Sequence, residues 1–131
     1  MLLADTSVWI EVFRKPSRIR LGPADIDDIT TCLPIVQEVL QGFTDDHAYR
    51  LAREALYALP MVESPLRAEV FEQAIDLYRA GRRAGVTVRS SVDCLIAACA
   101  IRHGLTVLHR DRDFTELARI SPLRERQVSL R

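Results

Sequence analysis

The sequence predicts an α/β fold with a mainly parallel central sheet and helices on both faces. Short apolar or β-branched stretches alternate with longer stretches in which apolar residues recur at helical spacing, and this alternation is typical of chains that build parallel sheets. The chain has 131 residues, a length that fits one domain with a substantial hydrophobic core. We therefore predict that residues 1–131 form a single domain.

The N-terminal half is predicted to contain two strands and four helices. A β-branched and apolar stretch indicates a strand at 29–33. Pro34 suits the first turn of the helix that follows it, and Gly42 suits its end. The expected order is a strand at 1–5, a helix at 6–14, a loop at 14–23, a short acidic helix near 24–29, a strand at 29–33, a helix from 34 to 42 and a helix at 45–58.

The C-terminal half is predicted to contain a long amphipathic helix and an almost wholly apolar one. Leu66, Val70, Ala74, Leu77 and Tyr78 recur on one helical face, whereas residues 91–103 are apolar on most sides and predict a buried helix. The expected order is a very short strand at 61–62, a helix at 66–84, a helix at 91–103, a strand at 105–109, a helix near 112–120 and an edge strand at 127–130.

Composition narrows the class of protein. Hydrophobic residues make up 48% of the chain and charged residues 27%, as in ordinary globular proteins. No apolar run approaches the length of about 18 residues that a membrane span needs, and the N-terminus lacks the features of a secretion signal. We expect a cytoplasmic protein without membrane contact, in which Cys32, Cys94 and Cys99 are reduced core residues.

The net charge is zero, but the charges are unevenly distributed. Residues 24–76 are rich in acids, whereas residues 77–112 and the loop at 14–20 are rich in arginine. Arginine suits bidentate contacts to phosphate, although each arginine taken singly is equally well explained as part of a solvated surface. The candidates for RNA contacts are Arg14, Lys15, Arg18, Arg20, Arg79, Arg82 and Arg83.

A carboxylate follows the first predicted strand directly. Asp5 lies between an apolar run and a helical stretch, and ligands of open parallel sheets bind beyond the carboxyl ends of the strands. Asp111 and Asp113 repeat this arrangement after the strand at 105–109. Each of these acids is also a favoured helix cap, so its position alone leaves both interpretations open.

Two further acids lie on predicted helices. Glu38 falls at the border of the apolar stripe of its helix, where a surface role is also open. Asp93 is the only charged residue between Arg89 and Arg102, and with Ser90 as N-cap it takes the third helical position of a capping box. Several carboxylates that converge repel one another unless a cation lies among them, and oxygen ligands favour Mg²⁺ or Mn²⁺ over zinc.

Four segments in order resemble the PIN-domain ribonucleases, and closely the toxins of bacterial VapBC toxin–antitoxin pairs. They are LLADTSVWIEVF, PIVQEVLQGF, SSVDCLIAACAIRHGLTVLHRD and DRDF, and together they span nearly the whole chain. The resemblance implies a single PIN-like domain that cleaves RNA with Mg²⁺ or Mn²⁺ and a metal-activated water. It also implies a cognate VapB-like antitoxin. An inactive PIN scaffold that only binds RNA or protein is the alternative.

The resemblance also implies roles for individual residues. Asp5, Glu38, Asp93 and Asp111 match the catalytic and metal-binding carboxylates of the family, and Asp113 matches an accessory metal ligand. Ser7 matches the hydroxyl residue that steadies the first aspartate, and Thr6 fits this role more loosely. No departure from the family pattern occurs at the four principal acids.

Two surfaces are candidates for protein partners. Ile26, Ile29, Phe43 and Leu51 are candidates to line a groove for a helix of the antitoxin, although each of them taken singly is better explained as part of the core. An arginine of the antitoxin is expected to reach the acids and pair with them. A homodimer is expected through the helix at 66–84, where Phe71 and Ile75 lie beyond the main apolar stripe.

Other enzyme classes fit the sequence poorly. Aspartyl-phosphate chemistry needs a second acid two residues after Asp5, where Ser7 stands, and a late lysine, whereas the only lysine is Lys15. Dinucleotide and P-loop sites lack their glycine patterns. The histidines His47, His103 and His109 are interpreted as surface or strand-end residues.

Overall fold

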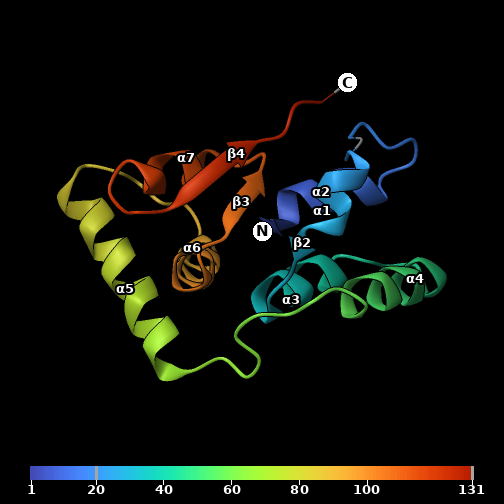
Figure 1. Cartoon of the computed structure of the whole chain (residues 1–131), viewed down its shortest axis with the longest axis horizontal. Helices are drawn as coiled ribbons and strands as arrows, with labels where there is room; N and C mark the ends of the chain where they lie inside the picture. The colour runs from blue at the N-terminus through green and yellow to red at the C-terminus, as the bar shows by residue number, and fades with distance from the viewer. Residues whose placement is uncertain (20, 131) are drawn as a thin grey trace.

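The computed structural model describes residues 1–19 and 21–130, and its centre is a parallel sheet (Figure 1). The strand order is β2-β1-β3-β4, and each neighbouring pair is parallel. This confirms the predicted mainly parallel α/β fold. The strands are β1 (Leu2–Ala4), β2 (Ile29–Thr30), β3 (Thr106–His109) and β4 (Arg124–Gln127).

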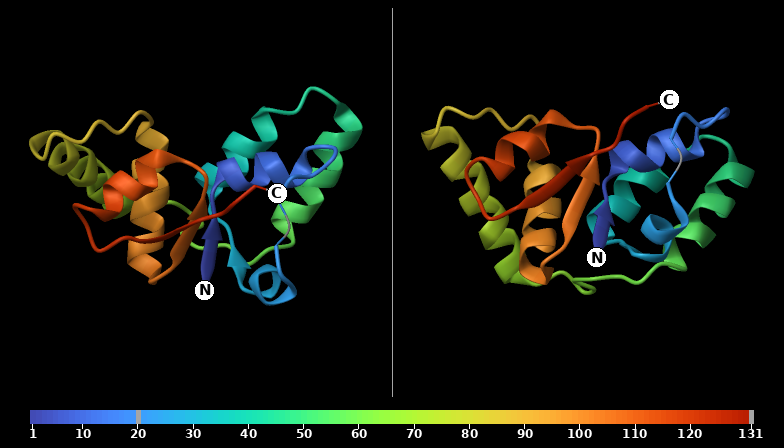
Figure 2. Two further views of the ribbon diagram at one scale, coloured as in Figure 1. Left: turned by 90° about the horizontal axis from the view of Figure 1, so that it is seen from above. Right: turned by 45° about the horizontal axis from the view of Figure 1, so that its top comes forward.

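Helices cover both faces of the sheet. Figures 1 and 2 place α5, α6 and α7 on one side of the strands, and α1, α3 and α4 on the other. The helices are α1 (Thr6–Phe13), α2 (Pro23–Asp27), α3 (Leu33–Gln41), α4 (Asp46–Tyr57), α5 (Ala68–Arg83), α6 (Ser91–His103) and α7 (Arg112–Ala118). Their order agrees with the prediction, and their ends differ from it by a few residues.

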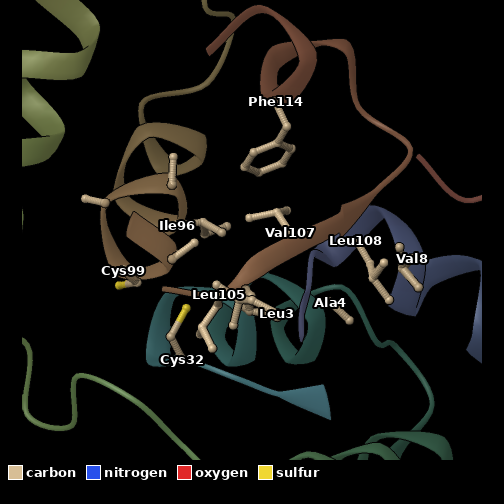
Figure 3. Close-up of a cluster of buried hydrophobic side chains, with 14 of the residues drawn as sticks. Leu3, Ala4, Val8, Cys32, Ile96, Cys99, Leu105, Val107, Leu108 and Phe114 are labelled. Atoms are coloured by element: carbon tan, nitrogen blue, oxygen red, sulfur yellow. The ribbon is translucent and has the colours of Figure 1, made fainter. Parts of the chain in front are cut away.

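The core lies on both faces of β1 and β3, against α6 and α7 on one face and α1 and α3 on the other. Leu3, Val107 and Phe114 are fully buried, and Figure 3 shows the Phe114 ring above Val107 and Leu3 beside Leu105. Helix α6 is buried along most of its length, as its apolar sequence predicted. The three cysteines are free and buried, so the prediction that they are core residues is confirmed.

The C-terminal strand begins three residues earlier than predicted. It consists of Arg124, Glu125, Arg126 and Gln127, whereas the apolar residues that suggested a strand at 127–130 lie mostly beyond it. The strand is polar because it is the edge of the sheet and is largely exposed. These residues form a strand because they pair with β3, and no pattern within residues 124–127 predicts that pairing. The predicted strand at 61–62 is a single bridge between Thr31 and Met61.

The adjacent pair β1 and β3 creates the site. Ala4 and Leu108 are partners in the parallel register, and the backbone N–H of Asp5 donates to the carbonyl of Leu108 at 2.9 Å. The carboxyl ends of the two strands therefore meet at one edge of the sheet. Among the described helices, none combines the length and hydropathy that crossing a bilayer requires.

Candidate active site

Asp5 is both a helix cap and a buried acid at the end of β1. Its Oδ2 accepts hydrogen bonds from the backbone N–H of Ser7 at 3.1 Å and from the Ser7 hydroxyl at 2.7 Å. Its Oδ1 is buried and accepts no hydrogen bond from any described residue. Burial is the main cause that raises the pKa of Asp5 above its ordinary value, and the hydrogen bonds from Ser7 oppose it. The capping interpretation is therefore correct, but it accounts for only one of the two oxygens.

Ser7 connects the two strands that carry acids. Its hydroxyl donates to Asp5 and accepts a hydrogen bond from the backbone N–H of Arg110 at 2.9 Å. One hydroxyl thus fixes the carboxylate after β1 to the turn after β3. The structure agrees with the expectation that Ser7 steadies Asp5.

Glu38 is held by Thr6 on the neighbouring helix. The Thr6 hydroxyl donates to Glu38 Oε1 at 2.8 Å, so α1 orients an acid that belongs to α3. Thr6 was expected to support the first aspartate less closely than Ser7 does. The structure assigns its hydroxyl to Glu38 instead.

Asp93 lies in the first turn of α6 without the partner that a capping box would supply. Ser90 is the N-cap residue, but its hydroxyl makes no capping hydrogen bond in the described chain. The backbone N–H of Ser90 donates to Asp113 Oδ2 at 3.2 Å rather than to Asp93. The Asp93 side chain is buried, and its Oδ2 lacks a partner among the described residues. The expected capping box is therefore absent, and the carboxylate of Asp93 is free for another role.

Asp113 replaces Asp93 as the cap of α6. Its Oδ2 accepts hydrogen bonds from the backbone N–H groups of Arg89 at 3.0 Å and Ser90 at 3.2 Å. Its own N–H donates to Asp111 Oδ1 at 2.9 Å, which makes Asp111 the N-cap of α7. Asp113 therefore links the N-terminal ends of α6 and α7, where Asp93 and Asp111 lie.

The five acids converge in two groups that share Asp93. In each group, one carboxylate oxygen of every member lies within 4.8 Å of the others. The groups are Asp5, Glu38 and Asp93, and Asp93, Asp111 and Asp113. Burial first, and then the neighbouring acids, raise the pKa of Asp93 to about 9. The acids therefore repel one another in a weakly solvated place.

These residues fit a hard divalent cation. All the donors in the two groups are carboxylate oxygens, which Mg²⁺ and Mn²⁺ prefer. Three buried oxygens, Asp5 Oδ1, Asp93 Oδ2 and Asp113 Oδ1, have no hydrogen-bond donor within the described chain. An orphaned buried acceptor is costly, and a cation among these oxygens would satisfy them.

Arg89 is a neighbour of the site that sequence reasoning did not single out. Its guanidinium lies 3.5 Å from Asp111 Oδ1 and 3.7 Å from Asp113 Oδ1, and its side chain is 60% exposed. It partly balances the charge of the second group from the solvent side. No local pattern distinguished Arg89 from the other arginines, because its partners are more than twenty residues away.

Two arginines of the basic loop after α1 already have an acidic partner. The loop itself contains no acid, but Arg14 and Arg18 form ion pairs with Glu11 of α1, at 3.3 Å and 3.0 Å. The structure places Lys15 in the exposed part of this loop, and Arg20 lies outside the described residues. Arg79, Arg82 and Arg83 lie in the C-terminal half of α5.

The similarity of this chain to known proteins extends over almost its whole length. Residues 2–120 match the PIN domain family. This chain belongs to the PIN-domain family. The VapC ribonuclease Mb1587 of Mycobacterium bovis and Ribonuclease VapC11 of Mycobacterium tuberculosis are each 43% identical to this PIN domain over 129 residues, which cover 94% of this chain and 96% of theirs.

The fold of this PIN domain also occurs in solved structures. One is VapBC-5 from Mycobacterium tuberculosis, a member of the VapBC family of toxin–antitoxin systems. It superposes with a TM-score of 0.70 at 20% identity, and the match covers 96% of this chain and 97% of the other. The identity to the two VapC ribonucleases places this PIN domain among the VapC proteins, as the four sequence segments suggested.

The environment of Asp93 predicts a specific dependence of stability on pH. In the metal-free protein its pKa rises from 3.8 to about 9, so the folded state retains a proton that the unfolded state loses. The free energy of unfolding should therefore fall as pH rises through that window. Asp93→Asn should flatten this fall and stabilise the metal-free protein at the alkaline end. Denaturant titrations at several pH values measure both effects.

The same variant tests whether Asp93 is a metal ligand. If Asp93 binds metal, cleavage by Asp93→Asn should fall by at least about 100-fold, although the protein remains folded. Asp45→Asn is the matched control, because Asp45 caps α4 through Ala48 on the exposed surface. Full activity in a folded Asp93→Asn protein would return Asp93 to a purely structural role.

Proposed function

We propose that this PIN domain hydrolyses RNA phosphodiester bonds with Mg²⁺ or Mn²⁺ held by Asp5, Glu38, Asp93, Asp111 and Asp113. The observation that supports this most directly is the pair of carboxylate groups that share Asp93. Their buried oxygens have no hydrogen-bond donor among the described residues, which favours a cation over a neutral ligand. The two ribonucleases that are 43% identical to this chain support the choice of RNA as substrate.

When bound, the cation supplies Lewis acidity, which activates a water and stabilises the charge that develops on the phosphodiester. The chain contributes the geometry. Ser7 and Thr6 orient Asp5 and Glu38 from one side, and the first turns of α6 and α7 present Asp93 and Asp111 from the other. The exposed guanidinium of Arg89 lies beside this second group, where it can contact a phosphate oxygen.

The alternative is a PIN scaffold that binds RNA or protein without cleaving. Such a scaffold has no need for acids that are buried together at the cost of raised pKa values. In this chain Asp5, Glu38, Asp93 and Asp111 are all present and oriented by specific hydrogen-bond partners or helix ends. These features favour the enzyme.

Purified protein should cleave structured RNA in Mg²⁺ or Mn²⁺ and should stop when EDTA is added. We expect 5′-phosphate and 3′-hydroxyl ends, because a water and not the ribose hydroxyl is the nucleophile. Gel electrophoresis followed by end-labelling reads both results. Cleavage that continues in chelator would rule out the metal mechanism, and cyclic phosphate ends would rule out attack by water.

We propose that Arg82 and Arg83 contact the RNA backbone. Both lie in the last turn of α5, and both residues are exposed. Arg14 and Arg18 would first have to leave Glu11, so we expect them to contribute less. The other two members of the basic loop, Lys15 and Arg20, remain proposals from sequence.

Replacing Arg82 and Arg83 by glutamine should weaken RNA binding and reduce its salt dependence by about one slope unit per lost contact. The Arg14→Gln, Arg18→Gln double variant removes the same charge and is the matched control. Binding to RNA at several salt concentrations, in Ca²⁺ if this prevents cleavage, measures the slope. Equal slopes for the Arg82/Arg83 variant and the wild type would mean that these arginines do not contact the RNA backbone.

We also propose that a cognate antitoxin occupies a groove between α1 and α3. The groove has a volume of about 560 Å³, and Glu38 lies in its wall. Its apolar lining includes Ile10, Phe13, Val39 and Phe43. An antitoxin arginine at this end would be close enough to pair with the acids in the bidentate geometry that arginine favours.

This groove differs from the one expected from sequence. Ile29 is buried in β2 and cannot line an open surface. Ile26 and Leu51 are exposed on α2 and α4, but they lie outside the lining of the groove. Only Phe43 belongs to both sets.

Two exposed apolar residues test which surface the antitoxin uses. Ile10 lines the groove and is 58% exposed, whereas Leu51 lies outside it and is 54% exposed. Ile10→Arg should lose rescue of growth by the co-expressed antitoxin and should not co-purify with it, whereas Leu51→Arg should retain both. The opposite result would place the partner on α4.

A homodimer remains part of this proposal. Phe71 and Ile75 are about half exposed on α5, as their positions in sequence predicted. Together with Tyr78, Val92 and Leu95 they line an apolar cavity of about 720 Å³ between α5 and α6. A second copy of the chain is the partner we propose for this face.

A further inference from the structure

His109 is a fully buried polar residue at the end of β3, two residues before Asp111. Both of its ring nitrogens have partners. Nδ1 faces the backbone N–H of Asp111 at 3.2 Å, and Nε2 lies 2.6 Å from Glu125 Oε2. Sequence reasoning gave this histidine no role beyond a strand end.

The partners of His109 determine its tautomer. The backbone N–H of Asp111 can only donate, so Nδ1 must accept and carries no proton. The ring proton then lies on Nε2 and is donated to the carboxylate of Glu125. A histidine with its proton on Nδ1 would lose the hydrogen bond to Asp111.

The sheet places Glu125 in position for this contact. Val107 pairs with Glu125 in the register of β3 and β4, and His109 pairs with Gln127. The backbone N–H of Val128 also donates to the carbonyl of His109 at 2.9 Å. The edge strand therefore fixes both the backbone and the ring of His109.

Two hydrogen bonds that involve a backbone N–H consequently hold Asp111. Its backbone N–H is fixed by the ring of His109, and its Oδ1 accepts from the N–H of Asp113. The first contact sets the turn that leaves β3, and the second sets the side chain at the start of α7. The other carboxylate oxygen of Asp111, Oδ2, accepts no hydrogen bond from a described backbone N–H.

We propose that His109, oriented by Glu125, is a positioning residue that sets the geometry of Asp111 for metal binding. This inference rests on the proposed function in one respect, namely that Asp111 is a metal ligand. Histidines and carboxylates that hold metal ligands from behind typically change metal affinity or activity by about 10–100-fold when they are replaced. Glu125 and His109 form such a support from the edge strand to the site.

A merely structural role for His109 predicts something different. Its ring also packs against Phe114, with ring centroids 5.4 Å apart, so its loss would destabilise the core whatever its hydrogen bonds do. If His109 positions Asp111, metal affinity should depend on whether the side chain at this position offers an acceptor where Nδ1 lies. The stability of the folded protein should instead depend on the size of this side chain and on its contact with Glu125.

Two variants separate these roles. In His109→Asn the side-chain oxygen takes the place of Nδ1 and keeps an acceptor for Asp111, but the ring and the bond to Glu125 are lost. In His109→Gln the terminal amide can still reach Glu125, but no acceptor remains at the position of Nδ1. We expect Mn²⁺ affinity to fall by about 10–100-fold in His109→Gln and by less in His109→Asn, and we expect stability to fall more in His109→Asn.

Glu125 supplies a second test from the edge strand. Glu125→Gln keeps an acceptor for Nε2–H and should retain Mn²⁺ affinity within about threefold, whereas Glu125→Val should lose about 10-fold. Both substitutions are at the edge of the sheet, where the Glu125 side chain is 24% exposed, so both variants should fold. His47→Gln is the control for a histidine change away from the site, because His47 is exposed on α4.

The experiment is Mn²⁺ titration of each variant, with thermal unfolding of the same samples. A ¹⁵N NMR spectrum of the metal-free wild type reports the tautomer of His109 whether or not any variant folds. A proton on Nε2, with metal affinity ordered as stated, supports the inference. A proton on Nδ1, or equal Mn²⁺ affinity in His109→Gln, Glu125→Val and wild type, overturns it. Mn²⁺ binding without RNA cleavage in the wild type would instead contradict the proposed function.

Discussion

The parallel pairing of β1 with β3 is the constraint on which the site depends. It places Asp5 beside the carbonyl of Leu108 and brings the turn after β3 within reach of the Ser7 hydroxyl. Residues separated by more than one hundred positions thus share one edge of the sheet. Because ligands of parallel sheets bind beyond the carboxyl ends of the strands, this pairing determines both where the acids meet and which elements can support them.

The acids are close enough to repel one another, and the fold holds them in place. Burial raises the pKa values of Asp5 and Asp93, so the metal-free site is unfavourable for several negative charges. Hydrogen bonds from Ser7, from Thr6 and from the N-terminal ends of α6 and α7 fix the carboxylates without neutralising them. This repulsion is the physical reason why a divalent cation would fit the site, since binding one would relieve a repulsion that folding has already created.

Support for the site comes from secondary-structure ends rather than from a dedicated loop. Asp113 caps α6, Asp111 caps α7, and His109 leads from the edge strand to Asp111. Each acid on this side is therefore tied to an element that packs in the core. Two surfaces, the groove between α1 and α3 and the cavity between α5 and α6, remain open for partners on either side of the site.

The sequence alone determined the alternation of strands and helices, the buried character of α6 and the set of acids to consider, because periodicity and strand-end positions are local patterns. The structure brings those acids together, and their catalytic roles stay predictions. Only the tertiary structure decided that Asp113 and not Asp93 caps α6, that Thr6 holds Glu38, that Glu11 pairs with Arg14 and Arg18, and that His109 is buried against Glu125. Most of these contacts join residues far apart in the chain, and a hydrogen bond across such a distance has no periodicity that a sequence can display.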